Sequence, residues 1–155
     1  MKGDPRIIDG LNALLTKELS AVDQYVVQSH MFANWGYAKL HERIAHEADD
    51  ERGHVSKLVH RILFLDGTPD VSSREPLQIG KEPRSMLEND LAYELEVARQ
   101  INQIIVLCGD ARDAGTRELL EELLKDTEED HIWWLKGQLH VIASVGLDKY
   151  LAEQL

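Results

Sequence analysis

The sequence lacks the features of disulfide-rich, loop-rich and membrane-spanning proteins. Its 155 residues include one cysteine, Cys108, which cannot form a disulfide within the chain and which fits a reducing compartment. Glycine contributes 10 residues and proline 4, fewer together than in an average protein, so a collagen-like or loop-rich chain is excluded. The longest unbroken apolar run spans residues 104–108, whereas a membrane helix needs about 20 residues. We expect a single cytoplasmic domain, residues 1–155, without a secretory leader.

Positive charge is also scarce. Lysine and arginine contribute 17 residues against 28 aspartates and glutamates, which gives a formal net charge of −11. An acidic protein repels nucleic acid and collects cations, so nucleic acid is excluded as a partner, and the short apolar runs exclude a membrane. A solvated acidic face would account for the charge equally well. The positions of the carboxylates must therefore decide between that reading and cation binding.

Apolar residues recur at helical spacing along nearly the whole chain, and no strand-like alternation lasts. We predict four long helices, at about residues 5–36, 37–66, 83 to 109–113, and 116–146, with a short amphipathic helix in 147–155. Asp4 and Pro5 suit a helix start, and Thr116 is a plausible cap of the fourth helix. Residues 67–82 are long enough to run the length of the bundle, which would place the third helix parallel to the second. The predicted fold is an all-α four-helix bundle with a long crossover between helices 2 and 3 and a short C-terminal fifth helix.

Each predicted long helix carries a carboxylate near the middle of its apolar face. The four are Glu18, Glu51, Glu94 and Glu128, and the second and fourth helices add His54 and His131 on the same faces. A buried carboxylate must be protonated, paired or bound to metal, and no lysine or arginine lies near these four on the same faces. Two divalent cations would balance the four carboxylates, and neutral imidazoles would complete the ligand set. We therefore predict a centre for two metal ions.

The same order of ligands occurs twice along the chain. Glu18 precedes the Glu-x-x-His motif at residues 51–54 by 33 residues, and Glu94 precedes a second such motif, at 128–131, by 34. One motif alone arises easily by chance in a chain rich in glutamate. Two copies on core-facing positions, each preceded by a glutamate at nearly equal spacing, indicate two helical hairpins that each supply half of one site.

With these six ligands placed, the chain resembles the bacterioferritins of the ferritin-like superfamily over essentially its full length. The supporting segments are MKGDP (1–5), KLHER (39–43), HEADDERGH (46–54), RILFLDG (61–67), DTEEDH (126–131) and GLDKYLAEQ (146–154). The resemblance implies a ferritin-like bundle, a homo-oligomeric shell of 24 subunits, cytoplasmic iron storage and a two-iron ferroxidase centre in each subunit. It also implies that O₂ or H₂O₂ oxidises Fe(II) and that the product is stored as ferric mineral.

The resemblance assigns a role to each ligand. By this resemblance, Glu51 and Glu128 bridge the two irons. Glu18 and His54 complete the ligands of one iron, and Glu94 and His131 complete those of the other. Ordinary ferritins lack the second Glu-x-x-His motif, so His131 favours the bacterioferritin branch.

Three further positions resemble functional residues of the family. Tyr25 resembles a tyrosine that accepts an electron or hydrogen-bonds a ligand carboxylate, and an ordinary core aromatic is the alternative. His46 and Asp50 lie four residues apart and resemble an iron site on the inner surface of the shell. A solvated charged face is the alternative for this pair.

Position 52 departs from the family pattern. Bacterioferritins typically carry a methionine there, and the thioethers of two subunits bind a haem across a two-fold interface. This chain has Arg52, whose cationic guanidinium offers no lone pair to iron. We expect no bis-methionine haem b in a shell of this chain alone, and a methionine-bearing bacterioferritin subunit is a candidate partner in a mixed shell.

Two other functions share the ligand pattern. A di-iron oxidase or oxygenase acting on an organic substrate uses the same ligands, but it usually needs a pocket beside the metals and a larger chain. A non-catalytic shell subunit could hold zinc or manganese, because carboxylates and imidazoles do not by themselves select iron.

Overall fold

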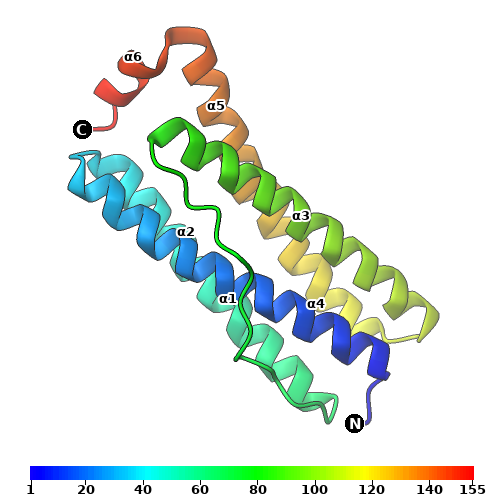
Figure 1. Cartoon of the computed structure of the whole chain (residues 1–155). Coiled ribbons are helices and arrows are strands. Elements are labelled where there is room, and N and C mark those ends of the chain that lie inside the picture. Colours follow the sequence, from blue (N-terminus) through cyan, green and yellow to red (C-terminus); the bar gives the residue numbers. More distant parts are fainter.

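The computed structural model describes all 155 residues and contains helices but no strands (Figure 1). The elements are α1 (Pro5–Asn34), α2 (Ala38–Phe64), α3 (Pro83–Asp110), α4 (Ala114–Lys125), the π-helix η1 (Asp126–Ile132), α5 (Trp133–Val145) and α6 (Leu147–Ala152). Helix α1 packs along α2, and α3 packs along the continuous rod of α4, η1 and α5. The predicted four-helix bundle with a short C-terminal helix is confirmed.

Local sequence explains where the helices start. Helix α1 begins at Pro5, and the carboxylate of Asp4 accepts a backbone N–H of the first turn. The fourth helix begins at Ala114, two residues before the predicted start, because Asp113 caps it in place of Thr116. The Asp113 carboxylate accepts the backbone N–H of Thr116 at 3.0 Å.

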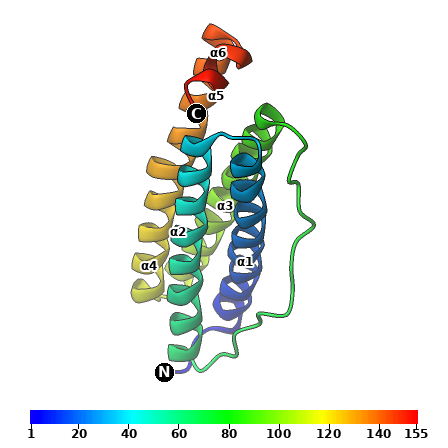
Figure 2. The same ribbon diagram turned by 90° about the vertical axis from the view of Figure 1, so that its left-hand side faces the viewer.

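The crossover between α2 and α3 lies lengthwise against α1 (Figure 2). Polar side chains of α1 hold the backbone of the crossover at successive positions along the helix. Asn12 Oδ1 accepts Asp70 N–H at 2.8 Å, and Ser20 Oγ accepts Glu75 N–H at 2.8 Å. Gln24 Oε1 accepts Gln78 N–H at 3.2 Å, and Gln28 Nε2 donates to Ile79 O at 2.9 Å. The crossover therefore returns the chain to the end of the bundle where α2 begins, and α3 runs parallel to α2 as predicted (Figure 1).

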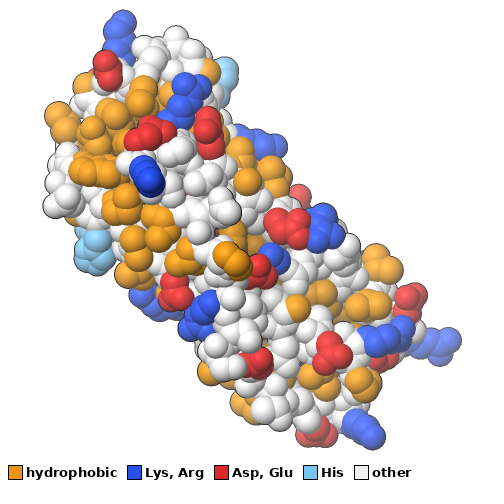
Figure 3. Space-filling model, viewed as in Figure 1, with side chains coloured by type: hydrophobic (Ala, Val, Ile, Leu, Met, Phe, Trp, Pro, Cys, Tyr) orange, Lys and Arg blue, Asp and Glu red, His pale blue; other side chains and the backbone are white.

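The bundle has two apolar cores. One contains 13 buried residues, among them Leu11, Leu58 and Ile101, and the other contains 11, among them Phe32 and Ile44. The residues between them along each long helix are buried but polar. On the surface, charged side chains are scattered along the bundle, and apolar side chains gather over the end nearest α6 (Figure 3). None of the helices has the length and apolar character needed to cross a bilayer.

Candidate metal centre

Five of the six predicted ligands meet in the polar layer between the two apolar cores. Helices α1 and α3 contribute one each, α2 contributes two, and η1 contributes one. All five are at most 3% exposed: Glu18, Glu51, His54, Glu94 and His131. Carboxylates buried this deeply cost folding free energy unless a positive charge neutralises them.

Glu51 lies between two groups of potential ligand atoms. Glu18 and His54 are on one side and Glu94 and His131 on the other, and within each group, with Glu51 included, the ligand atoms lie within 4.8 Å of one another. His54 Nδ1 is 3.3 Å from Glu51 Oε2, and His131 Nδ1 is 3.2 Å from Glu51 Oε1. Because each oxygen of Glu51 faces a different histidine, this carboxylate can bridge two cations.

The charges within the site are unbalanced in a way that suits bound cations. Both oxygens of Glu18 and one oxygen of Glu94 are buried without a hydrogen-bond donor. Burial, reinforced by the charge of Glu51, raises the pKa of Glu18 well above its usual value. Burial opposes a charged His54, but the neighbouring carboxylates of Glu18 and Glu51 outweigh it and raise the pKa of His54 to about 11. Against the same opposition from burial, carboxylate neighbours raise the pKa of His131. The protons on the two histidines therefore supply positive charge at the positions where bound metal ions would supply it.

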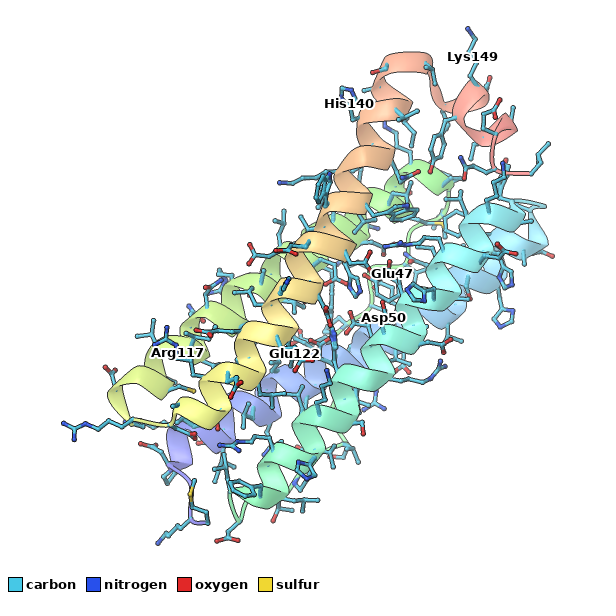
Figure 4. The ribbon with its side chains drawn as sticks, turned by 180° about the vertical axis from the view of Figure 1, so that it is seen from behind. Glu47, Asp50, Arg117, Glu122, His140 and Lys149 are labelled. Atoms are coloured by element: carbon cyan, nitrogen blue, oxygen red, sulfur yellow. The ribbon has the colours of Figure 1, made fainter.

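A third group of possible ligands borders the centre: Glu47, Asp50, Asp130 and His131. Glu47 and Asp50 lie on the side of α2 that faces the rod of α4, η1 and α5 (Figure 4). The predicted pair of His46 and Asp50 also comes together here, with His46 Nε2 3.3 Å from Asp50 Oδ2 and the histidine side chain 58% exposed. The role of this pair in iron transfer stays a prediction.

Glu128 is the predicted ligand that the structure does not bring into the centre. Its side chain is exposed and belongs to none of the three groups, so its predicted position on the buried face is wrong. The cause is η1, whose i→i+5 hydrogen bonds widen the helical turn, so that residues three apart no longer share a face. Thr127 and His131, four apart, are buried together with Ile132.

Tyr25 is in direct contact with a ligand carboxylate. Its hydroxyl donates a hydrogen bond to Glu94 Oε1, and the side chain is 2% exposed. Burial, with the nearby charge of Glu94, raises the pKa of Tyr25 well above its usual value, so the phenol stays protonated and remains a donor. The structure thus contains the predicted contact, and electron transfer to Tyr25 stays a prediction.

Comparisons with known proteins agree with this geometry. A model of the ferritin-like domain matches residues 8–145. A bacterial ferritin of Synechocystis is 45% identical over 155 residues, which cover 100% of this chain and 99% of the relative. The chain belongs to the ferritin family. A bacterial ferritin of Paramagnetospirillum magnetotacticum is 47% identical, over 97% of this chain and 93% of the relative. A bacterioferritin of Mycolicibacterium paratuberculosis is 39% identical, over 99% of this chain and 96% of the relative.

Membership in the ferritin family supports iron storage as the general function and implies that the chain binds iron. The donor set is consistent with that metal, because carboxylate and imidazole ligands suit iron. The need for a cation is independent of the comparisons, since it depends on buried oxygens that lack a donor of their own.

Sequence reasoning missed three acidic residues around this ferritin centre. Glu47 is 2.7 Å from His131 Nε2, and Asp126 is 3.3 Å from His54 Nε2. Asp90 is fully buried, and its Oδ1 accepts a hydrogen bond from Gln24 Nε2 at 2.8 Å. The available signal was helical spacing, because Glu47 precedes Glu51 by four residues and Asp90 precedes Glu94 by four.

Proposed function

We propose that this chain is a ferroxidase that oxidises Fe(II) to Fe(III) at a two-iron centre and stores the product as ferric mineral in a 24-subunit shell. The observation that carries the proposal is the position of Glu51 between two groups that each hold one further glutamate and one histidine. Two irons that share Glu51 would be able to deliver two electrons together to one oxidant. With oxygen, the balanced reaction is 4 Fe(II) + 4 H⁺ + O₂ giving 4 Fe(III) + 2 H₂O.

The ligands divide into two sets that share one residue. One iron would be held by Glu18, Glu51 and His54, and the other by Glu51, Glu94 and His131. Glu47, which is beside His131 and also pairs with Arg43, adds a fourth carboxylate at the edge of the centre. Negatively charged oxygen donors stabilise Fe(III) more than Fe(II), so this ligand set favours oxidation.

An open hollow beside the centre suits a cation better than an organic substrate. It reaches His54 between α2 and the rod of α4 and η1, and none of its lining residues is hydrophobic. The lining residues are Asp49, Asp50, Gly53, His54, Lys57, Asp126 and Asp130. Four carboxylates against one lysine would attract Fe(II), whereas organic substrates usually bind in largely apolar pockets.

The size of the assembly tests the storage part of the proposal. Light scattering coupled to size exclusion should give a mass close to 24 times the 17.6-kDa chain. If this chain requires a methionine-bearing partner subunit, the 24-subunit peak should form only when the two are produced together. A stable monomer or dimer under both conditions would contradict a storage shell.

An anaerobic titration tests the oxidation. Fe(II) is added without oxygen, air is admitted, and ferric absorbance is followed with time. We expect a fast phase of about two irons per chain followed by slow mineral growth, and an oxygen electrode should record about four irons oxidised per O₂. Parallel runs with H₂O₂ show which oxidant reacts faster.

Substitutions connect the fast phase to the centre. Glu94→Gln and His131→Ala should abolish it, because each removes a ligand of one iron. Glu122→Gln is the matched control, since Glu122 is exposed on α4 and pairs with Lys57 at 2.6 Å. Normal fast phases in both ligand variants would place the oxidation elsewhere.

A further inference from the structure

Both histidines of the centre have an acidic residue on each side of the ring. Nδ1 of each histidine faces the proposed iron ligands, whereas Nε2 faces a carboxylate outside that set. His131 Nε2 is 2.7 Å from Glu47 Oε2 and 3.4 Å from Asp50 Oδ2, and His54 Nε2 is 3.3 Å from Asp126 Oδ2. The two halves of the centre therefore repeat one arrangement of carboxylate, histidine and ligand group.

We propose that Glu47 and Asp126 are positioning residues that hold His131 and His54 with Nδ1 directed at the metal ions, and that they hold them unequally. A histidine that binds a metal through one ring nitrogen usually donates the N–H of the other to a carboxylate or carbonyl, which fixes the tautomer and the ring orientation. This inference rests on the metal centre proposed above and extends it to residues that make no contact with the ions.

The carboxylate behind His131 is the more rigidly held of the two. The Glu47 side chain is 4% exposed, and its Oε1 is 2.6 Å from Arg43 Nη2. Arg43 is fixed in turn, because the same nitrogen lies 2.9 Å from Asp130 Oδ1 and the guanidinium lies 4.8 Å from the centre of the Trp134 ring. His131 is therefore supported by a chain of charged groups with little freedom to move.

The carboxylate behind His54 lacks this support. The Asp126 side chain is 53% exposed, borders the open hollow and forms no ion pair with a lysine or arginine. A hydrogen bond to a solvated, unanchored carboxylate constrains a ring less than one to a buried and paired carboxylate. The ion held by Glu18, Glu51 and His54 should therefore bind more weakly and exchange faster than the ion held by Glu51, Glu94 and His131.

Co(II) binding tests the proposal without depending on iron oxidation. Titrations follow the visible absorption bands of bound Co(II), which report both affinity and coordination geometry, in the assembled protein. The wild type should bind two ions with unequal affinities. Glu47→Gln should weaken the tighter ion by about 10- to 100-fold and shift its bands, and Asp126→Asn should weaken the looser ion by less than about tenfold.

Matched variants separate positioning from general damage. Glu121→Gln, on the exposed side of α4, touches neither histidine and should leave both affinities unchanged. Glu47→Gln keeps an oxygen that can accept the Nε2–H, so it should weaken binding less than Glu47→Ala. If Glu47→Gln does not assemble, Glu47→Asp, whose shorter side chain withdraws the carboxylate from His131, should show the same weakening.

Three results would overturn the inference or its basis, and they differ from one another. Identical Co(II) curves for the wild type and Glu47→Gln would refute a positioning role. A wild type with three bound ions, of which Glu47→Gln loses one and leaves the other two unaltered, would make Glu47 a direct ligand. A wild type that binds no pair of Co(II) ions would refute the metal centre itself.

Discussion

Tyr25 on α1 donates a hydrogen bond to Glu94 on α3, and the two residues come from different helical hairpins. The contact therefore joins the halves of the bundle at the level of the metal centre. It also fixes one oxygen of Glu94, while the other oxygen is buried without a donor and remains free for a cation. Glu94 Oε1 also lies 3.3 Å from His131 Nδ1, so the hydroxyl and the imidazole together orient this buried carboxylate.

Tyr25→Phe should weaken metal binding without changing its stoichiometry. Phenylalanine fills nearly the same space but cannot donate to Glu94, so that carboxylate loses its orientation. Loss of a hydrogen bond that orients a metal-binding side chain lowers the affinity for the metal by about tenfold or more. Competition between the protein and a Zn(II) indicator should show weaker binding of one of the two ions, with the melting curve used to exclude unfolding. Equal affinities in the variant and the wild type would show that the hydroxyl does not orient Glu94.

Glu18→Gln should have opposite effects on the metal-free and metal-loaded protein. Both oxygens of Glu18 are buried without donors, and burial raises its pKa, so a neutral amide costs less in the metal-free state. We expect the metal-free variant to melt at or above the wild-type temperature near pH 8. Divalent metal at about 100 times its dissociation constant should stabilise the wild type by about 2.7 kcal/mol, and the variant by clearly less. Calorimetry of both forms checks this, and an equal metal-induced shift would contradict the assignment.

The helical hairpins and the crossover could be predicted because they follow from local, additive signals. Apolar spacing marked the buried face of each helix, and the length of residues 67–82 matched the length of the bundle. Four of the predicted ligands, Glu18, Glu51, His54 and Glu94, lie on helices of regular geometry, so counting by threes and fours placed them correctly on the buried face. Buried carboxylates on an apolar face were informative because they cost so much free energy without a partner.

The fourth helix could not be predicted in the same way. Counting by threes and fours assumes the α-helical turn, and η1 departs from it over Asp126–Ile132. Nothing in the composition of this segment distinguishes a π-helix from an α-helix. The outer carboxylates Glu47 and Asp126 were missed for a different reason, since they act through histidines and are identified only by distances between helices.

The π-helix predicts that Glu128→Gln leaves both ions bound. Because the side chain is exposed, its removal should change the Co(II) affinities by less than about twofold, whereas Glu94→Gln should remove one ion. Isothermal titration of the two variants beside the wild type makes the comparison. Loss of one ion in Glu128→Gln would mean that η1 refolds to an α-helix on metal binding and turns Glu128 inward as a bridging ligand.

Arg52 predicts the behaviour of the shell towards haem. Its side chain is 54% exposed and pairs with Asp49 at 2.5 Å, so it stands on the surface of α2 and not in the metal centre. Protein purified with haem supplied should lack the visible spectrum of a bis-methionine haem, because a guanidinium cannot bind iron. Arg52→Met should gain that spectrum if two copies meet across this face, and Arg52→Leu is the control. A bis-methionine signature in the wild type would contradict the prediction.

Asp90→Asn should stabilise the metal-free protein more at high pH than at low pH. Burial raises the pKa of Asp90 from 3.8 to about 8, so between these values the folded state holds a proton that the unfolded state has released. The stability of the wild type therefore falls as pH rises from about 4 to 8, and the full cost of an ionised Asp90 is present above pH 8. Asparagine keeps an oxygen for the hydrogen bond from Gln24 but cannot ionise. Melting temperatures at pH 5 and pH 8.5 should show a larger gain for the variant at pH 8.5, and a gain that does not change with pH would show that Asp90 does not titrate in this range.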